Sequence, residues 1–264
     1  MFGIDTSVRL SERRTATLLR AIGKRAYYGR DILRALRDPE TWFRESIRQM
    51  RNIGVESVPL AVIVAAFLGG VTAFQTRYQL FPGVQLSVVG LIIRQSIVLE
   101  LGPLLTALVL TGRVGARMTA EIGTMRVTEQ IDALETLSFD PVAYLGLPRV
   151  IAALVMLPAL VVVANATAIF SAWATLVLAT DVRTSDFVEG LRLSFTYFQV
   201  VYSLIKATLF GGAIAFVCSY EGYVTEAGAE GVGSSTALAV VISSVSILVL
   251  DAIVAAVLAP FIQA

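Results

Sequence analysis

The chain has 264 residues, of which 56% are hydrophobic and only 16% charged, and its mean hydropathy is +0.76. Soluble domains carry about 25% charged residues, so this composition excludes an ordinary cytosolic globule and equally a disordered chain. The net charge of +1 argues against a nucleic-acid partner. The chain has no His and only one Cys, which excludes Cys/His metal sites, disulfide frameworks and His-dependent nucleophiles.

The N-terminal segment is strongly basic. Twelve Lys and Arg residues precede the first apolar run, which begins at residue 57. No secretory signal, which would consist of a charged region, a short apolar stretch and a cleavage site in that order, is visible before that run. The run is therefore expected to act as its own insertion signal. The positive-inside rule predicts a cytoplasmic N-terminus. We therefore expect residues 1–37 to form a basic cytoplasmic segment, with nothing in the pattern to show whether it folds.

Residues 38–54 are predicted to form an amphipathic helix. Asp38 is a suitable N-cap, followed by Pro39 at the first helical position. Apolar side chains gather on one face and arginines elsewhere, with Trp42 alongside; the face comprises Phe43, Ile47 and Met50, and the arginines are Arg44, Arg48 and Arg51. The pattern favours a helix lying in the lipid interface. The alternative is a soluble helix packed on another subunit.

Five apolar segments are long enough to cross a bilayer. Twenty uncharged residues at 1.5 Å each give roughly the 30 Å of a hydrocarbon core. The third segment exceeds that length and requires tilt or a break, for which Pro158 is the natural place. Five spans would put the C-terminus outside. The prediction is an all-α integral membrane protein, whose permease domain covers residues 55–264 and whose spans are 57–76, 85–112, 150–180, 198–220 and 231–260.

Four charged residues lie within these spans: Arg94, Glu100, Lys206 and Asp251. Each costs a few kcal/mol in the bilayer unless it is paired or hydrated, so each is a candidate functional residue. Arg94 and Glu100 are six residues apart and cannot pair on one helix, so their partners must lie on other helices. The structural alternative is an ion pair or carbonyl contact that holds the bundle together. For Glu100, beside Gly102-Pro103, we favour a role in the lipid path.

The segment 113–140 between the second and third spans is predicted to lie in the cytoplasm. Met118, Ile122 and Met125 recur at helical spacing, and Thr128 before Glu129 resembles a capped helix start. One interpretation is a helix lying on the membrane surface. The other is a docking element for a cytoplasmic protein.

The glycine-rich stretch 228–236 resembles a loop but is not a phosphate-binding loop. It lacks the required Lys before Ser/Thr and a strand before the glycines. The chain is therefore not expected to be an enzyme or to hydrolyse ATP, and energy must come from a partner.

The run from Glu100 to Leu134, ELGPLLTALVLTGRVGARMTAEIGTMRVTEQIDAL, resembles the MlaE/YrbE permease family of ABC-type lipid transporters. Further similarity lies in Asp140-Pro141, Leu147-Pro148-Arg149, Gly222-Tyr223, GVGSST at 231–236, and Leu250-Asp251. The resemblance covers nearly all of the chain from Asp38 onward. One departure is visible, because the family often has Arg where this chain has Leu99.

The resemblance implies a homodimer in the bacterial inner membrane that moves phospholipids or related lipids to or from the outer envelope. It implies a partner ATPase carrying ATP and Mg²⁺, a periplasmic MCE-domain protein and a small STAS-like cytoplasmic protein, with no cofactor on this chain. It places a coupling helix in residues 113–137. The residues implied to couple to the ATPase are Arg117, Met118, Glu121, Thr124, Met125, Arg126, Glu129, Gln130 and Asp132.

Two other functional classes remain open. A secondary transporter would use Glu100, Lys206 and Asp251 as a proton or ion relay, and a proton gradient alone would then drive transport. A membrane scaffold that only docks soluble partners would tolerate replacement of these charges.

Overall fold

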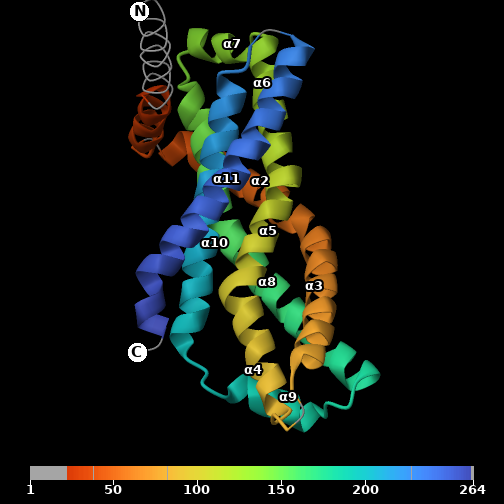
Figure 1. Ribbon diagram of the computed structural model, residues 1–264. Coiled ribbons are helices and arrows are strands. Elements are labelled where there is room, and N and C mark those ends of the chain that lie inside the picture. Colours follow the sequence, from red (N-terminus) through yellow and green to blue (C-terminus); the bar gives the residue numbers. More distant parts are fainter. Residues whose placement is uncertain (1–22, 38, 82, 227, 263–264) are drawn as a thin grey trace, which may run out of the picture.

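The computed structural model describes residues 23–37, 39–81, 83–226 and 228–262, and the described part consists of helices and their connections without a strand. The predicted N-cap Asp38 lies outside the described residues. The helices form an elongated bundle (Figure 1). In chain order, a first helix covers 23–35 and is followed by α2 Pro39–Ile53, η1 Val55–Ser57, α3 Val58–Gln79, α4 Ser87–Gln95, η2 Ser96–Leu101, α5 Gly102–Leu110, η3 Thr111–Gly115, α6 Ala116–Val127, α7 Gln130–Thr136, η4 Val142–Gly146, α8 Leu147–Ala179, α9 Thr184–Arg192, α10 Tyr197–Tyr223 and α11 Ala229–Ile262.

The five predicted spans are confirmed. Helical segments of sufficient length and apolarity cover Thr41–Gln79, Ser87–Val127, Val142–Ala179, Tyr197–Tyr223 and Ala229–Leu258. The chain is therefore an all-α, multi-pass membrane protein. The glycine-rich stretch 228–236 is helical from Ala229 onward, so the interpretation that it resembles a loop is wrong.

The second span differs from the prediction at its end. Residues 113–127 are not a loop, because η3 and α6 continue the helix without interruption to Val127. The 41 residues from Ser87 to Val127 measure about 60 Å, twice the thickness of a bilayer core. The last turns of α6 therefore extend beyond the membrane, at the end of the bundle that also carries α7 (Figure 1).

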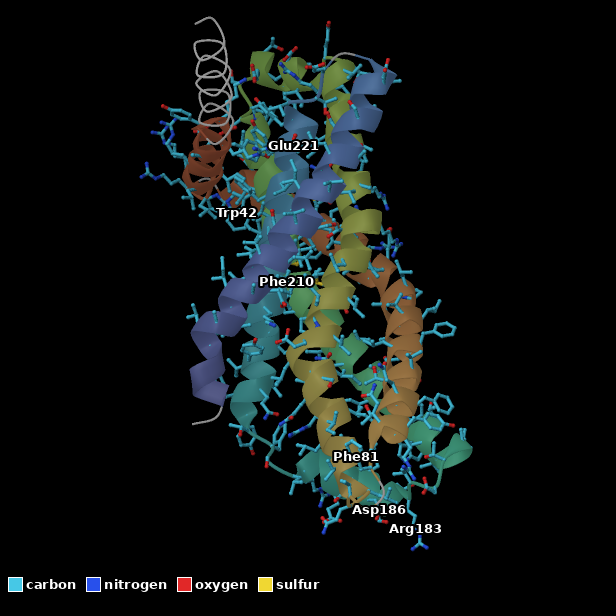
Figure 2. All side chains as sticks on the ribbon, viewed as in Figure 1. Trp42, Phe81, Arg183, Asp186, Phe210 and Glu221 are labelled. Atoms are coloured by element: carbon cyan, nitrogen blue, oxygen red, sulfur yellow. The ribbon has the colours of Figure 1, made fainter. Side chains whose placement is uncertain are left out.

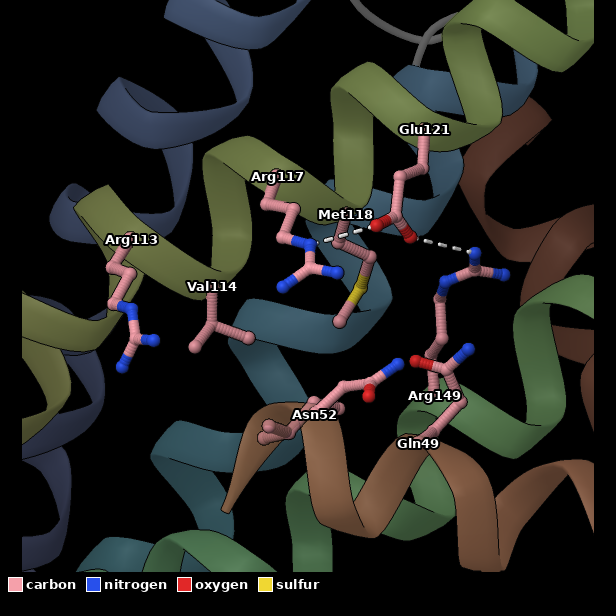
Figure 3. A pocket seen from close by; sticks show the side chains of 9 residues that line it. Gln49, Asn52, Arg113, Val114, Arg117, Met118, Glu121 and Arg149 are labelled. Atoms are coloured by element: carbon pink, nitrogen blue, oxygen red, sulfur yellow. Dashed lines mark hydrogen bonds and ion pairs between the residues drawn. The ribbon is translucent and has the colours of Figure 1, made fainter. Parts of the chain in front are cut away.

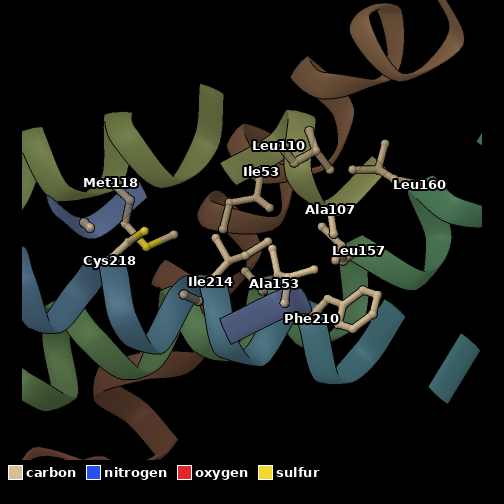
Figure 4. Packing of buried hydrophobic residues seen from close by; sticks show 14 of the residues in the cluster. Ile53, Ala107, Leu110, Met118, Ala153, Leu157, Leu160, Phe210, Ile214 and Cys218 are labelled. Atoms are coloured by element: carbon tan, nitrogen blue, oxygen red, sulfur yellow. The ribbon is translucent and has the colours of Figure 1, made fainter. Parts of the chain in front are cut away.

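The third span is one 33-residue helix, α8, which runs through Pro158 without a break. It lies between α3 and α10, the two helices with which it makes its most extensive contacts. Figure 4 shows Ala153 and Leu157 of α8 packed with Phe210 and Ile214 of α10. The helix therefore continues beyond the thickness of a bilayer core without a break at the proline, and α3 and α10 pack along it.

Small residues bring α3 and α8 into close backbone contact. A Cβ added at Gly69 would overlap the carbonyl of Ala168, whereas one added at Gly70 would meet two side-chain hydroxyls, those of Thr175 at 3.3 Å and Ser171 at 3.8 Å. Close approach through small residues is a principal source of helix association in membranes, where water does not drive it.

Gly69→Ala is therefore expected to lower the free energy of unfolding by about 1–3 kcal/mol, because the backbone of Ala168 cannot yield as a side chain could. Thermal unfolding in detergent measures this. Gly70→Ala is the matched control, since it adds the same atom one residue away and should leave the melting temperature nearly unchanged. Equal melting temperatures for the two variants would contradict the proposed contact.

The N-terminal helix, 23–35, docks on the bundle through Tyr28. That ring is buried against Phe216, Tyr220 and Tyr223, with ring centroids 5.6–5.9 Å apart, and burial raises the pKa of Tyr28 to about 12. Arg25 donates to Glu221 at 2.7 Å, which is the most direct electrostatic tie to α10. The described end of the basic segment is thus folded onto the bundle.

The helix α2 leaves most of its predicted apolar face uncovered by the bundle, where a helix in the lipid interface would meet lipid. Ser46, Gln49 and Ile53 are buried, whereas Phe43 and Ile47, predicted for the apolar face, are more than half exposed.

Figure 2 shows Trp42 and Glu221 toward one end of the bundle and Phe81, Arg183 and Asp186 at the other. The helix 23–35 and the α6–α7 end therefore lie away from the α3–α4 and α8–α9 connections (Figure 1).

At the latter end, Arg77 of α3 forms two hydrogen bonds to Asp181, at 2.7 and 2.8 Å. The hydrogen bonds from Arg77 lower the pKa of the Asp181 carboxyl. A carboxyl with a lowered folded pKa stabilises the protein above its unfolded pKa of about 4, and that stabilisation is lost as the pH falls through the folded value.

The melting temperature of the protein should therefore exceed that of Asp181→Asn at pH 6, and the difference should shrink below about pH 4 as the carboxyl is protonated. Thermal unfolding of both proteins across this range measures the effect. A difference independent of pH would show that the ion pair does not contribute.

Candidate functional site

Three of the four charged residues predicted within the spans meet in one cluster. The ammonium of Lys206 on α10 lies 2.5 Å from Oε2 of Glu100 on η2 and 2.8 Å from Oδ1 of Asp251 on α11. Each carboxylate is thus paired with a cation on another helix. For Glu100 this was expected, because Arg94 on the same span is six residues away and cannot reach it. The cluster joins three spans that are far apart in the sequence.

Backbone geometry around Glu100 prepares the cluster. Pro103 has no N–H, so it leaves the carbonyl of Leu99 without its usual helical donor. The Lys206 ammonium lies 3.3 Å from that oxygen and donates to it. The N–H of Gly102 reaches back to the carbonyl of Ile97, one residue further than in an α-helix, which produces the π-helical turn that carries Glu100. The proline and the π turn together create a polar point within an apolar helix.

Burial within the cluster is unequal. The Lys206 side chain is fully buried and that of Asp251 is 18% exposed, whereas the Glu100 side chain is 45% exposed. Tyr202, one turn before Lys206, donates to Glu100 Oε1 at 3.3 Å. Two carboxylates and one ammonium leave a formal charge of −1, and Glu100 is the member open to the surroundings of the chain.

A second polar contact lies beside the cluster. Asn165 on α8 donates to the hydroxyl of Ser203 on α10 at 3.2 Å. A Cβ at Gly102 would overlap Asn165 Oδ1 and lie 2.7 Å from the carbonyl oxygen of Ile97, so glycine leaves room for both where η2 meets α5. Gly102-Pro103 therefore serves both purposes: Gly102 admits a polar side chain from α8, and Pro103 frees the acceptor for Lys206.

Arg94 stands apart from the cluster. It is buried on α4 and donates to the carbonyls of Leu193 and Ser194, at 3.1 and 3.3 Å, with its guanidinium 5.3 Å from the ring centre of Phe195. These hydrogen bonds match the structural alternative, a carbonyl contact that holds the bundle together. Arg94 holds the connection that follows α9 against α4, and the structure places it with neither Glu100 nor Lys206.

Where α6 emerges from the bundle, a second ion network surrounds a small pocket (Figure 3). Glu121 accepts from Arg117 at 2.8 Å and from the buried Arg149 of α8 at 3.3 Å. Arg117 also reaches Glu56 at 3.0 Å, and Arg113 donates to the carbonyl of Glu56. The network ties α6 to α8 and to the α2–α3 junction, so α6 is a rigid extension of the second span.

Beyond this network, α6 and α7 form an elbow, residues 116–137. The predicted capped start at Thr128 is wrong, since its hydroxyl donates back to Thr124 and the residue preceding α7, Glu129, has a left-handed backbone with φ of 60°. Arg126 bridges the elbow to Asp132 at 2.6 Å. Of the nine residues implied for coupling, Met118 is buried, Arg117 and Glu121 pair within the network, Met125 packs on the core, Arg126 pairs with Asp132, and Thr124, Glu129, Gln130 and Asp132 are exposed.

The comparisons with known proteins decide the family. The family described as Permease MlaE matches residues 46–257. The chain belongs to the MlaE permease family. A probable ABC transporter permease protein of Rickettsia bellii is 37% identical over 239 residues, which cover 90% of this chain and 92% of the relative. A probable ABC transporter permease protein of Synechocystis is 38% identical over 210 residues, 78% of each chain.

A more distant relative is the Arabidopsis protein TRIGALACTOSYLDIACYLGLYCEROL 1, chloroplastic, which is 32% identical over 233 residues covering 84% of this chain and 63% of the relative. Its name contains that of a glycolipid. The MlaE family match includes η2, α6, α7, α10 and most of α11, and hence both the ion cluster and the elbow.

Two residues of the candidate site, Tyr202 and Asn165, were not predicted from the sequence. Tyr202 could have been found, because it lies four residues before Lys206 and therefore on the same helix face. Asn165 gave no comparable signal, since it is a single amide in a long apolar helix and its partner is on another span.

Proposed function

We propose that the chain is the permease subunit of an ATP-driven transporter that moves phospholipids or related lipids between the inner membrane and the outer envelope. The observation that carries the proposal is the cluster of Glu100, Lys206 and Asp251, in which one carboxylate remains open within a membrane span of an MlaE-family chain. An open carboxylate beside apolar helices suits a path that must pass both the polar and the apolar parts of a lipid. The glycolipid in the Arabidopsis relative's name supports a lipid substrate.

The proposed assembly contains two copies of this chain, a separate ATPase that binds ATP and Mg²⁺, and an MCE-domain protein on the outer side, together with a small STAS-like protein in the cytoplasm. The relatives' names as ABC transporter permeases support the ATPase partner. We place the chain in the bacterial inner membrane with the N-terminus in the cytoplasm. The twelve basic residues before residue 57 support that orientation, which puts the elbow where an ATPase could meet it.

Glu100→Ala tests the role of the open carboxylate. The variant should insert and fold normally, because Lys206 keeps its partner Asp251 at 2.8 Å. Lipid transfer by the complex reconstituted in vesicles should fall at least tenfold. Transfer at the wild-type rate would show that Glu100 is not in the lipid path.

A proton- or ion-coupled transporter is the second candidate, and the buried Lys206 between two carboxylates is the observation that favours it. Reconstituted vesicles separate the two. Transport driven by ATP without a proton gradient supports the ABC proposal, whereas transport driven by the gradient alone, without an ATPase subunit, supports the second candidate.

A further inference from the structure

A cavity of about 660 Å³ lies between α2 and the segment that joins α7 to η4. Arg44 and Arg48 line it from α2, one helical turn apart, with Ile47 beside them. Phe139 and Tyr144 line it from the other side, and their ring centroids are 6.4 Å apart. The volume falls within the range of ligand pockets, about 300–1,000 Å³. This cavity contains none of the residues of the ion cluster.

The charge of the cavity suits an anion. Glu45 also lines it, but its carboxylate is shared, since Oε1 accepts from Gln49 at 2.9 Å and Oε2 lies 3.7 Å from Arg48. Two guanidinium groups against one carboxylate give the lining a formal charge of +1. Guanidinium groups bind phosphate oxygens through paired, charge-assisted hydrogen bonds, which makes a phosphate group the fitting anion.

The position of the cavity suits a lipid. α3 begins at Val58, five residues after α2 ends at Ile53, so α2 lies where the first span enters the membrane. Phe43 and Ile47 are 59% and 56% exposed beside the arginines, and Phe139 across the cavity is 49% exposed. Apolar side chains next to basic ones on one helix are typical of the boundary between headgroups and acyl chains.

We propose that this cavity binds one anionic phospholipid of the leaflet in which α2 lies. Its phosphate lies between Arg44 and Arg48, and its acyl chains run along Ile47 and Phe139. Because the cavity is bounded by α2 on one side and by Phe139 and Tyr144 on the other, the bound lipid links α2 to the segment that follows the elbow. The lipid is a resident ligand, separate from any lipid transported past Glu100.

The test is a titration of the full purified chain with phosphatidylglycerol or phosphatidylcholine, in which native mass spectrometry measures the bound lipid. The wild-type chain should bind one phosphatidylglycerol more tightly than phosphatidylcholine. Arg44→Gln/Arg48→Gln should weaken phosphatidylglycerol binding about thirtyfold, since each basic residue near an anionic leaflet contributes about a factor of five. Binding of phosphatidylcholine should weaken less, because its choline group already neutralises the phosphate.

Arg30→Gln/Arg34→Gln is the matched control, because it removes two exposed arginines one turn apart on the neighbouring helix and leaves the cavity intact. Arg44→Lys/Arg48→Lys keeps the charge without the planar guanidinium and should give intermediate binding, which guards against a variant that simply misfolds. Equal losses in the Arg44/Arg48 and Arg30/Arg34 glutamine variants would overturn the proposal in favour of nonspecific attraction. Unchanged lipid binding with loss of a co-purifying partner would overturn it in favour of an acidic protein segment.

Discussion

Lys206→Met is expected to lower the free energy of unfolding by about 3–5 kcal/mol and to abolish lipid transfer, because it leaves two carboxylates inside the bundle without a cation. The side chain of Lys206 is fully buried, and Met retains most of its length and apolar volume. The loss would therefore report the unpaired charges of Glu100 and Asp251 rather than a cavity. Thermal unfolding in detergent and lipid transfer in vesicles measure the two effects.

The triple variant Glu100→Gln/Lys206→Met/Asp251→Asn separates structure from function. It removes all three charges together, and replacing a whole buried ion cluster with neutral groups is often neutral for stability. Its melting temperature should return close to that of the wild type, whereas lipid transfer should stay lost. A triple variant that transports normally would show that none of the three charges takes part in lipid transfer.

The number of spans could be predicted because span length is a local property. A run of about twenty apolar residues specifies a transmembrane helix without reference to any other part of the chain. The cost of a charge in the bilayer is equally local, so Lys206 and its two carboxylates were visible as candidates before their partners were known. The pairing itself depends on how three spans cross, which no spacing along the chain encodes.

The end of the second span could not be predicted for the same reason. The charges of Arg113, Arg117 and Glu121 predict that the span ends near residue 112 and that a separate cytoplasmic helix follows it. In the structure they continue the helix, because Glu56 and Arg149, distant in sequence, supply their partners. Likewise, Tyr28 anchors the basic N-terminal segment through three rings of α10, and neither its own segment nor its charge pattern indicates that contact.

The elbow provides the last expected result, which concerns coupling to the proposed ATPase. Ile131 is the buried residue of α7 and is fully enclosed in the core cluster, whereas Leu137, the residue that follows α7, is 68% exposed. A seven-residue helix is not stable in isolation, so α7 depends on this contact and on the bridge from Arg126 to Asp132 for its position.

Ile131→Ala should therefore release α7 locally without unfolding the spans, because truncating a buried Ile costs about 2–5 kcal/mol, and the other contacts of α7 include the partly buried Leu134 and the Arg126–Asp132 bridge. ATPase activity stimulated by lipid, and lipid transfer, should both fall at least tenfold in the reconstituted complex, while the melting temperature of the spans changes by only a few degrees. Leu137→Ala, which removes an exposed side chain from the same elbow, is the control for docking and should retain α7. If Ile131→Ala transports normally while hydrogen exchange shows α7 released, the position of α7 does not transmit the work of the ATPase, and coupling must pass through the rigid extension of α6 alone.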